Sequence, residues 1–326
     1  MTINTTTQTL TRPERSERPE RPAVIAGTQP PPASSAGDVV LAYLRIHAHT
    51  LQSLEPKVRA GEFDSVHQMR VATRRLRATL RTYRPVIPRT DSEHLAGELK
   101  WLGQALGLAR DGEVLSAHLQ DSLRPTPPEL LIGPVMAHVQ GHYAPLRAQA
   151  RTALLEAFDS PRYHRLLAEL DRVTAGPPRG PQAGAPAREI LPAAVRRAFR
   201  QARRRMRRAR HTPAGPARDT ALHQARKSAR RARYAAEAAA PAAGKPARRF
   251  ARQMKRVQSV LGDHHDAVLA RQAARDLGVA AYLAGENAFT YGLLHERELH
   301  RAQRREADTR HVWRRAARPK HRRWMK

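Results

Sequence analysis

The chain has 326 residues, of which 40% are hydrophobic, so it is long enough for one large or two medium globular domains. Lys and Arg total 59 against 29 Asp and Glu, which gives a formal net charge of +30. This excess predicts a polyanionic partner. Arg greatly outnumbers Lys, which favours phosphate, because a planar guanidinium matches two phosphate oxygens at once. The chain has no Cys, which excludes disulfides, thiol catalysis and thiolate metal sites.

The sequence gives no sign of a membrane span, a leader or a catalytic centre. No apolar run reaches about 18 residues and no apolar stretch follows Met1, so we expect a cytoplasmic protein that makes no membrane contact. A Gly-rich phosphate loop, a carboxylate pair and a nucleophile with a base are all missing. We therefore expect a protein that is not an enzyme and has no catalytic residues and no cofactor.

The chain begins with a polar segment, residues 1–36, that combines Thr, Pro, Arg and Glu and is predicted to be a disordered tail. Asp38 is a candidate N-cap for the first helix, whose apolar residues recur at helical spacing. Gly61 lies at or just after the end of this helix.

The next helix has Asp64 or Ser65 as its candidate N-cap and runs until Pro85. It carries one basic face and one apolar face. At 100° per residue, one arc of roughly 80° contains five basic residues, which are His67, Arg70, Arg74, Arg77 and Arg81. The apolar residues of the same helix cluster on the opposite side: Met69, Leu76, Leu80 and Tyr83. This pattern predicts a helix with one side for a core and the other for an anion.

The rest of the first half is predicted to be helical as well. Residues 94–123 suggest two helices with a break near Gly107–Asp111, where Asp111 is either the N-cap of the second helix or an Arg partner. A loop at 125–128 precedes a long helix from about Glu129 to Phe158, and Ser160 and Pro161 open a short one. No stretch alternates with period 2, so no sheet is expected.

A Pro/Gly segment, residues 176–186, is the best candidate for a boundary between the two halves. The expected organisation is a first half at 37–175, a second half at 187–318, and a basic C-terminal tail at 319–326.

The second half repeats the pattern of the first, which identifies an internal repeat. The basic motif recurs 156 positions later as His223, Arg226, Arg230, Arg231 and Arg233. A Lys…Leu-Gly-x-x-x-Asp motif also occurs twice, with Lys100, Gly107 and Asp111 matching Lys255, Gly262 and Asp266.

These paired His-x-x-Arg-x-x-x-Arg-Arg-x-Arg helices, each followed by Leu-Gly-x-x-x-Asp, resemble the CHAD family over roughly residues 38–318. The resemblance implies an all-α fold of two four-helix-bundle-like halves, related by pseudo-twofold symmetry, with a basic central channel. It also implies that the chain binds inorganic polyphosphate as a stand-alone module.

The candidate polyphosphate-binding residues come from the two motif helices and the helices that follow them. They are His67, Arg70, Arg74, Arg77, Arg81, Lys100, Arg110, His223, Arg226, Lys227, Arg230, Arg233 and Lys255. Three alternatives remain open: a nucleic-acid-binding protein, a phosphohydrolase or non-catalytic regulatory subunit of a polyphosphate-metabolising enzyme, and a structural scaffold of polyphosphate granules. The adjacent His264, His265 and Asp266 have no second cluster at ligand spacing, so no metal site is expected.

Overall fold

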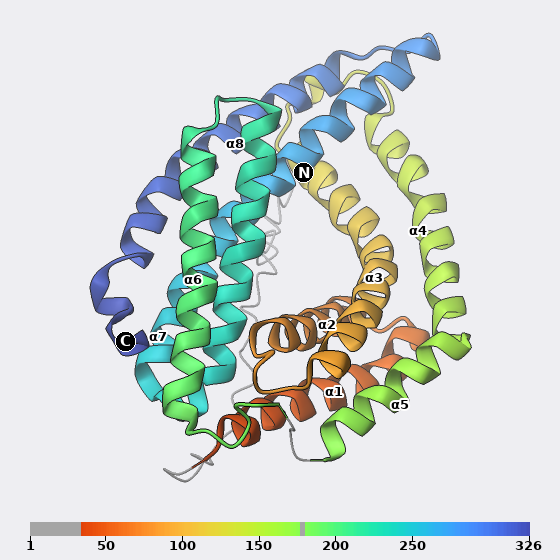
Figure 1. Cartoon of the computed structure of the whole chain (residues 1–326). Helices are drawn as coiled ribbons and strands as arrows, with labels where there is room; N and C mark the ends of the chain where they lie inside the picture. The colour runs from red at the N-terminus through yellow and green to blue at the C-terminus, as the bar shows by residue number, and fades with distance from the viewer. Residues whose placement is uncertain (1–33, 177–179) are drawn as a thin grey trace, which may run out of the picture.

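The computed structural model describes residues 34–176 and 180–326, and over these residues the protein is helical apart from loops and one isolated β-bridge, Ser35 to Pro186. The predicted all-α class is confirmed (Figure 1). Of the tail expected at 1–36, residues 1–33 lie outside the described part. The elements are α1 (Ala36–Ala60), α2 (Ser65–Thr82), α3 (Arg89–Leu123), η1 (Pro128–Leu130), α4 (Val135–Asp159), α5 (Pro161–Ala175), α6 (Ala187–His211), α7 (Pro216–Leu283), α8 (Phe289–Ala316), η2 (Pro319–His321) and η3 (Arg323–Met325).

Helix α1 begins three residues earlier than the sequence suggested. Ser35 is the N-cap, and its hydroxyl accepts a hydrogen bond from the Asp38 backbone N–H at 3.1 Å. The Ser35 backbone N–H in turn donates to the Asp38 carboxylate at 3.2 Å, which completes a capping box. Asp38 is therefore the third helical residue and not the N-cap. The predicted end at Gly61 is confirmed, since Gly61 adopts φ 74°, a left-handed conformation that closes the helix.

The break predicted near Gly107–Asp111 is wrong, because α3 continues without interruption from Arg89 to Leu123. Asp111 lies inside this helix and cannot cap it. The corresponding region of α7, around Gly262 and Asp266, is also continuous. Glycine lowers helix propensity by only about 1 kcal/mol, which tertiary packing offsets here.

The real interruption in the second half lies at Gly244, inside α7. Gly244 has φ 65° and ψ −147°, a backbone conformation that side chains with a Cβ rarely adopt, so α7 consists of two helical segments joined by a sharp kink. Pro241 and Pro246 flank the kink. The first segment carries the His223 motif, and the second carries Gly262 and Asp266.

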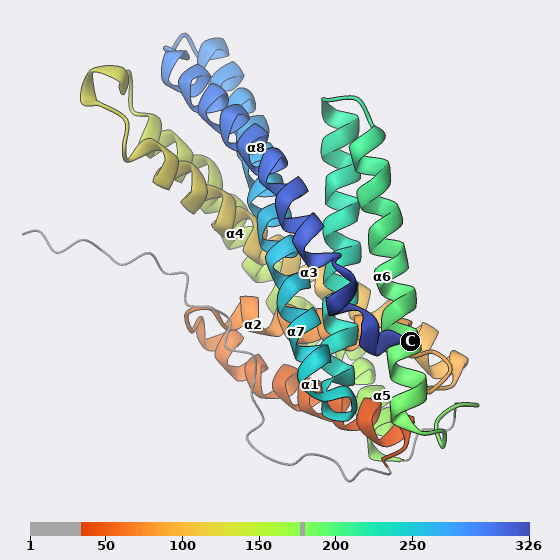
Figure 2. The ribbon, with the colours of Figure 1, turned by 90° about the vertical axis from the view of Figure 1, so that its left-hand side faces the viewer.

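Two hydrophobic clusters hold the molecule together. The larger one joins buried residues of both halves, from Leu44 in α1 to Phe250 in α7. The smaller one lies farther out, where the ends of α3 and α7 pack against the starts of α4 and α8 through residues such as Leu123, Val139 and Tyr291. Figure 2 shows this four-helix arm extending away from α1 and α2, apart from the hairpin of α6 and the first segment of α7.

The described part of the Pro/Gly segment packs against the first half. Gln182 donates its backbone N–H to the Pro85 carbonyl at 2.8 Å, and Gly37 donates to the Ala183 carbonyl at 2.8 Å. The C-terminal residues expected as a basic tail form η2 and η3, in which Met325 is buried in the larger cluster. Of the helices in the described ranges, none combines the length and the apolar composition needed to cross a bilayer.

Candidate functional site

The two motif helices bury the apolar faces that the sequence predicted. Met69, Leu76 and Leu80 of α2 are all 0% exposed, so this side of the helix is locked in the core. In α7 the matching positions are filled by small residues, with Ala225 and Ala232 equally buried. Burying one side of each helix fixes the direction of the other, so the basic side chains point away from the core.

The basic sides of α2 and α7 approach each other at four arginines, which we call the central arginine cluster: Arg70, Arg74, Arg226 and Arg230. Burial and the nearby guanidiniums lower the pKa of Arg230 to about 10, with contributions from Arg226 and Arg70. Burial lowers the pKa of Arg226 as well, and the charges of Arg74 and Arg70 add to that effect. The structure thus brings together cations that lie about 156 residues apart in the chain.

A second group of cations lies beside the first, and we call it the outer arginine cluster: Arg77, Arg81, Arg84 and Arg231. Burial lowers the pKa of Arg231, and the charges of Arg81, Arg77 and Arg84 lower it further. Burial and Arg81 likewise lower the pKa of Arg77. Arg231 and Arg84 were absent from the predicted site.

Several nitrogen atoms of these residues are buried without a hydrogen-bond partner. They include the Nε atoms of Arg77, Arg226 and Arg230 and the Nδ1 atom of His223. A buried polar atom without a partner costs about 1–3 kcal/mol, and more when the group is charged. An anion bound between the helices would supply the missing acceptors and relieve the repulsion.

The Leu-Gly-x-x-x-Asp motifs hold the first arginine of each basic row. Arg70 Nη1 lies 2.6 Å from Asp111 Oδ1, and a Cβ on Gly107 would lie 3.4 Å from Arg70 Nη2. In the second half, a Cβ on Gly262 would lie 3.4 Å from Arg226 Nε and Nη2. Each glycine leaves space for a guanidinium to lie flat on the helix, and Asp111 acts as an Arg partner, one of the two roles predicted for it.

Asp266 occupies the corresponding place beside Arg226 but is more enclosed than Asp111. Burial raises the pKa of Asp266, while the Arg226 charge acts in the opposite direction. The motif aspartate is therefore exposed in the first repeat and partly buried in the second.

His223 packs against a second histidine, His265, with ring centroids 3.9 Å apart. Burial and the charges of Lys227, Arg226 and Arg230 lower the pKa of His223 to about 4. Burial, His223 and the nearby cations lower the pKa of His265 to about 3. Both rings are therefore neutral near pH 7. The sequence offered His265 only as a metal ligand, so its contact with His223 was missed.

A partly buried carboxylate, Glu237, connects the motif helices. Its Oε1 lies 2.7 Å from Arg233 Nε and its Oε2 lies 3.3 Å from Arg75 Nε. Both guanidiniums also lie over the Tyr234 ring, 5.5 Å from its centroid. Arg233 was predicted to face the ligand, but its side chain is only 4% exposed and ion-paired. We therefore assign Arg233 to the contact between the helices and leave it out of the proposed ligand set.

The remaining predicted residues differ in their exposure and in the ion pairs that they form. Arg110 is ion-paired with Glu113 at 2.6 Å and lies 3.9 Å from Asp64. Lys100 and Lys227 are exposed. Of the other predicted residues, Arg81 is exposed, and His67 and Lys255 are partly buried.

No group of three or more candidate metal ligands occurs within 34–176 and 180–326. His264 lies 3.4 Å from the Asp219 carboxylate, so it is engaged in a contact between α7 segments. Asp219 also pairs with Arg271 at 3.3 Å.

Comparison with known proteins places the chain in a family. Residues 42–275 match the CHAD domain family. The chain belongs to the CHAD family. It is 35% identical over 248 residues to uncharacterized protein Rv2226 of Mycobacterium tuberculosis strain H37Rv, and equally to MT2285 of strain CDC 1551. These matches cover 76% of this chain and 47% of each relative, so the match spans about half of their length.

Two solved structures share the fold of this CHAD domain. PptA from Streptomyces chartreusis superposes with a TM-score of 0.73 at 20% identity, covering 86% of this chain and 100% of PptA. The CHAD domain from the plant Ricinus communis superposes with a TM-score of 0.63 at 26% identity, covering 86% and 91%. The predicted CHAD resemblance is thereby confirmed, whereas the pseudo-twofold relation between the halves stays a prediction.

The CHAD match contains both arginine clusters and both Leu-Gly-x-x-x-Asp motifs, since all of them lie between residues 42 and 275. The last eight residues of α7, all of α8 and the C-terminal 3₁₀ helices lie beyond it.

Proposed function

We propose that this CHAD domain binds inorganic polyphosphate between α2 and the first segment of α7, through the central and outer arginine clusters. The observation that carries the proposal is the approach of like-charged guanidiniums whose buried Nε atoms have no acceptor, at Arg77, Arg226 and Arg230. Charge repulsion and unsatisfied donors destabilise the unliganded protein. A bound polyanion removes both effects, and the free energy that is recovered contributes to its affinity.

The chemistry of the arginine clusters suits a chain of phosphates. Polyphosphate is flexible and carries charged oxygens on every unit, so it needs a row of fixed donors and no groups that read bases. Guanidiniums at positions i and i+4, such as Arg70 and Arg74, are about one helical turn or 5.4 Å apart. Bidentate Arg–phosphate bonds are strong and short. Binding releases counterions, so the affinity falls as salt rises.

In a cell, such a module would localise to polyphosphate granules or attach a polyphosphate-metabolising enzyme to its substrate. The proposed role is binding, because the arginine clusters offer donors without a group placed to transfer a phosphoryl unit. Release of orthophosphate from polyphosphate by the purified protein would contradict this part of the proposal.

The proposal is tested by reversing one charge on each motif helix, with Arg74→Glu combined with Arg230→Glu. We expect this variant to lose polyphosphate binding while its circular dichroism stays that of the native protein. The matched control reverses two exposed arginines outside both clusters, Arg275→Glu in α7 with Arg304→Glu in α8, which changes the net charge by the same amount. If the two variants lose affinity equally, binding follows net charge and the proposed site is wrong.

A further inference from the structure

Helix α6 carries a row of polar side chains on the side that meets the outer arginine cluster. At 100° per residue, one arc of about 60° contains four of them, which we call the α6 row: Arg197, Gln201, Arg204 and Arg208. The three arginines are exposed, and the row spans about 17 Å along the helix. No Asp or Glu occurs from Ile190 to Arg218, so the surrounding sequence offers no local counter-charge.

Two observations connect the α6 row to the outer arginine cluster. Gln201 Oε1 accepts a hydrogen bond from Arg231 Nη1 at 2.9 Å. Arg197 lies near Tyr83, the C-cap residue of α2, since burial raises the pKa of Tyr83 and the Arg197 charge acts in the opposite direction. The α6 row therefore begins beside the end of α2 and beside Arg231.

From this contact the α6 row runs alongside the first segment of α7. The two helices form an antiparallel hairpin (Figure 1), so a step forward on α6 matches a step backward on α7. With Gln201 opposite Arg231, Arg204 comes level with Ser228, the neighbour of Lys227. Lys227 is exposed and is one of the predicted polyphosphate-binding residues. The α6 row therefore continues the basic surface of the outer cluster toward the tip of the hairpin.

The first half has no equivalent row, although α1 opens that half as α6 opens the second. Helix α6 contains ten arginines, whereas α1 contains two, Arg45 and Arg59. The protein itself engages both of the latter: Arg45 Nε donates to the Thr174 carbonyl at 2.7 Å, and Arg59 Nε lies 2.9 Å from Glu55 Oε1. The fold that the halves share therefore does not require the additional cations of α6.

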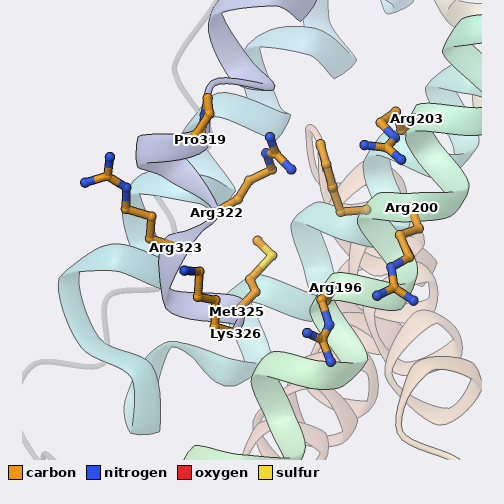
Figure 3. A pocket seen from close by; sticks show the side chains of 9 residues that line it. Arg196, Arg200, Arg203, Pro319, Arg322, Arg323, Met325 and Lys326 are labelled. Atoms are coloured by element: carbon orange, nitrogen blue, oxygen red, sulfur yellow. The ribbon is translucent and has the colours of Figure 1, made fainter.

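Another side of α6 provides an internal comparison. Arg196, Arg200 and Arg203 line a cavity of about 280 Å³ between α6 and the C-terminal elements η2 and η3 (Figure 3). Around the helix, this set is centred roughly 100° from the α6 row. Its arginines have the same charge and length but face the C-terminal residues instead of the outer cluster.

We propose that the α6 row extends the polyphosphate site, so that a long chain leaves the outer arginine cluster along α6 and contacts Arg197, Arg204 and Arg208. This inference rests on the proposed function and adds a preference for long chains to it. Once one part of a chain is bound at the outer cluster, its next units are held beside the α6 row at a high effective concentration. A short chain fills the clusters without reaching the row.

The test combines Arg204→Ala with Arg208→Ala in the full chain and measures binding of tripolyphosphate and of long-chain polyphosphate by calorimetry. We expect long-chain polyphosphate to bind about fivefold more weakly and the affinity for tripolyphosphate to stay unchanged. For the long chain, the slope of log affinity against log salt should become shallower by about 1.4, because two phosphate contacts are lost at about 0.7 each. The matched control, Arg196→Ala with Arg203→Ala, removes the same charge from the cavity side of α6 and should keep the wild-type values.

The outcomes separate this inference from the proposed function. If the control weakens long-chain binding as much as the α6-row variant, α6 acts only through its net charge and the extension is wrong. If the α6-row variant binds long chains like the wild type while Arg74→Glu with Arg230→Glu does not, the ligand stays within the arginine clusters and only the extension fails. Equal losses for tripolyphosphate and long chains would contradict the length preference. Wild-type binding by Arg74→Glu with Arg230→Glu would overturn the proposed function itself.

Discussion

Replacing Arg230 by methionine should stabilise the unliganded protein while it weakens polyphosphate binding. Burial and the neighbouring guanidiniums lower the pKa of Arg230 to about 10, against an ordinary value of about 12.5. At about 1.4 kcal/mol per pKa unit, the charged form is disfavoured in the folded state by about 3 kcal/mol. Methionine removes the charge and keeps much of the volume, so we expect a gain of about 1–3 kcal/mol in the free energy of unfolding.

Arg233→Met is the matched control, three residues farther along the same helix. Arg233 is ion-paired with Glu237 at 2.7 Å, so its loss should cost about 2 kcal/mol. Urea denaturation followed by circular dichroism measures both variants, with and without long-chain polyphosphate. The ligand should raise the stability of the wild type much more than that of Arg230→Met. If Arg230→Met is destabilised as much as Arg233→Met, Arg230 is a structural residue and its charge is not held for a ligand.

Three further predictions follow from the same contacts. Glu237→Gln should lower the free energy of unfolding by about 3 kcal/mol, since two buried guanidiniums lose their carboxylate; unchanged urea midpoints would contradict this. The pKa values of His223 and His265 are about 4 and about 3, below the value of about 6.5 in the unfolded chain. Between a pH of about 6.5 and these lower values the unfolded state binds more protons than the folded state. The free energy of unfolding should therefore fall as pH drops below about 6.5. A polyanion raises both pKa values, so affinity should rise as pH falls, and calorimetry in two buffers of different ionisation enthalpy should detect proton uptake; identical heats would argue against it. Finally, the logarithm of polyphosphate affinity should fall linearly with the logarithm of salt concentration, and a flat line would exclude charge pairing as the main source of affinity.

Helical periodicity predicted much of this fold because one-sided burial leaves a clear pattern. The apolar side of α2 follows from Met69, Leu76 and Leu80, all of which are fully buried. The repeat between the halves predicted a second helix of the same kind, and α7 contains it. The glycine in each Leu-Gly-x-x-x-Asp motif was misjudged, because a glycine that makes room for a neighbouring arginine looks the same in sequence as one that ends a helix.

The partners of individual arginines could not be predicted from periodicity. Arg75 and Arg233 turn toward Glu237, whereas Arg231 joins the outer cluster. The repeat aligns Arg75 with Arg231, yet their surroundings differ because the carboxylate exists only on α7. For this reason Arg231 was left out of the predicted site and Arg233 was included in it. The burial of Met325 depends on contacts with residues more than about 70 positions away, such as Phe250 of the same cluster, and no local pattern signals it.

We propose that the arginine clusters select a phosphate chain over other polyanions. The most direct measurement is a titration of the purified protein with long-chain polyphosphate in physiological salt, with single-stranded RNA and duplex DNA of matched total charge as competitors. We expect polyphosphate to stay bound in an excess of either nucleic acid. Displacement at charge equivalence would contradict it and would show that the surplus of arginine forms a general polyanion surface.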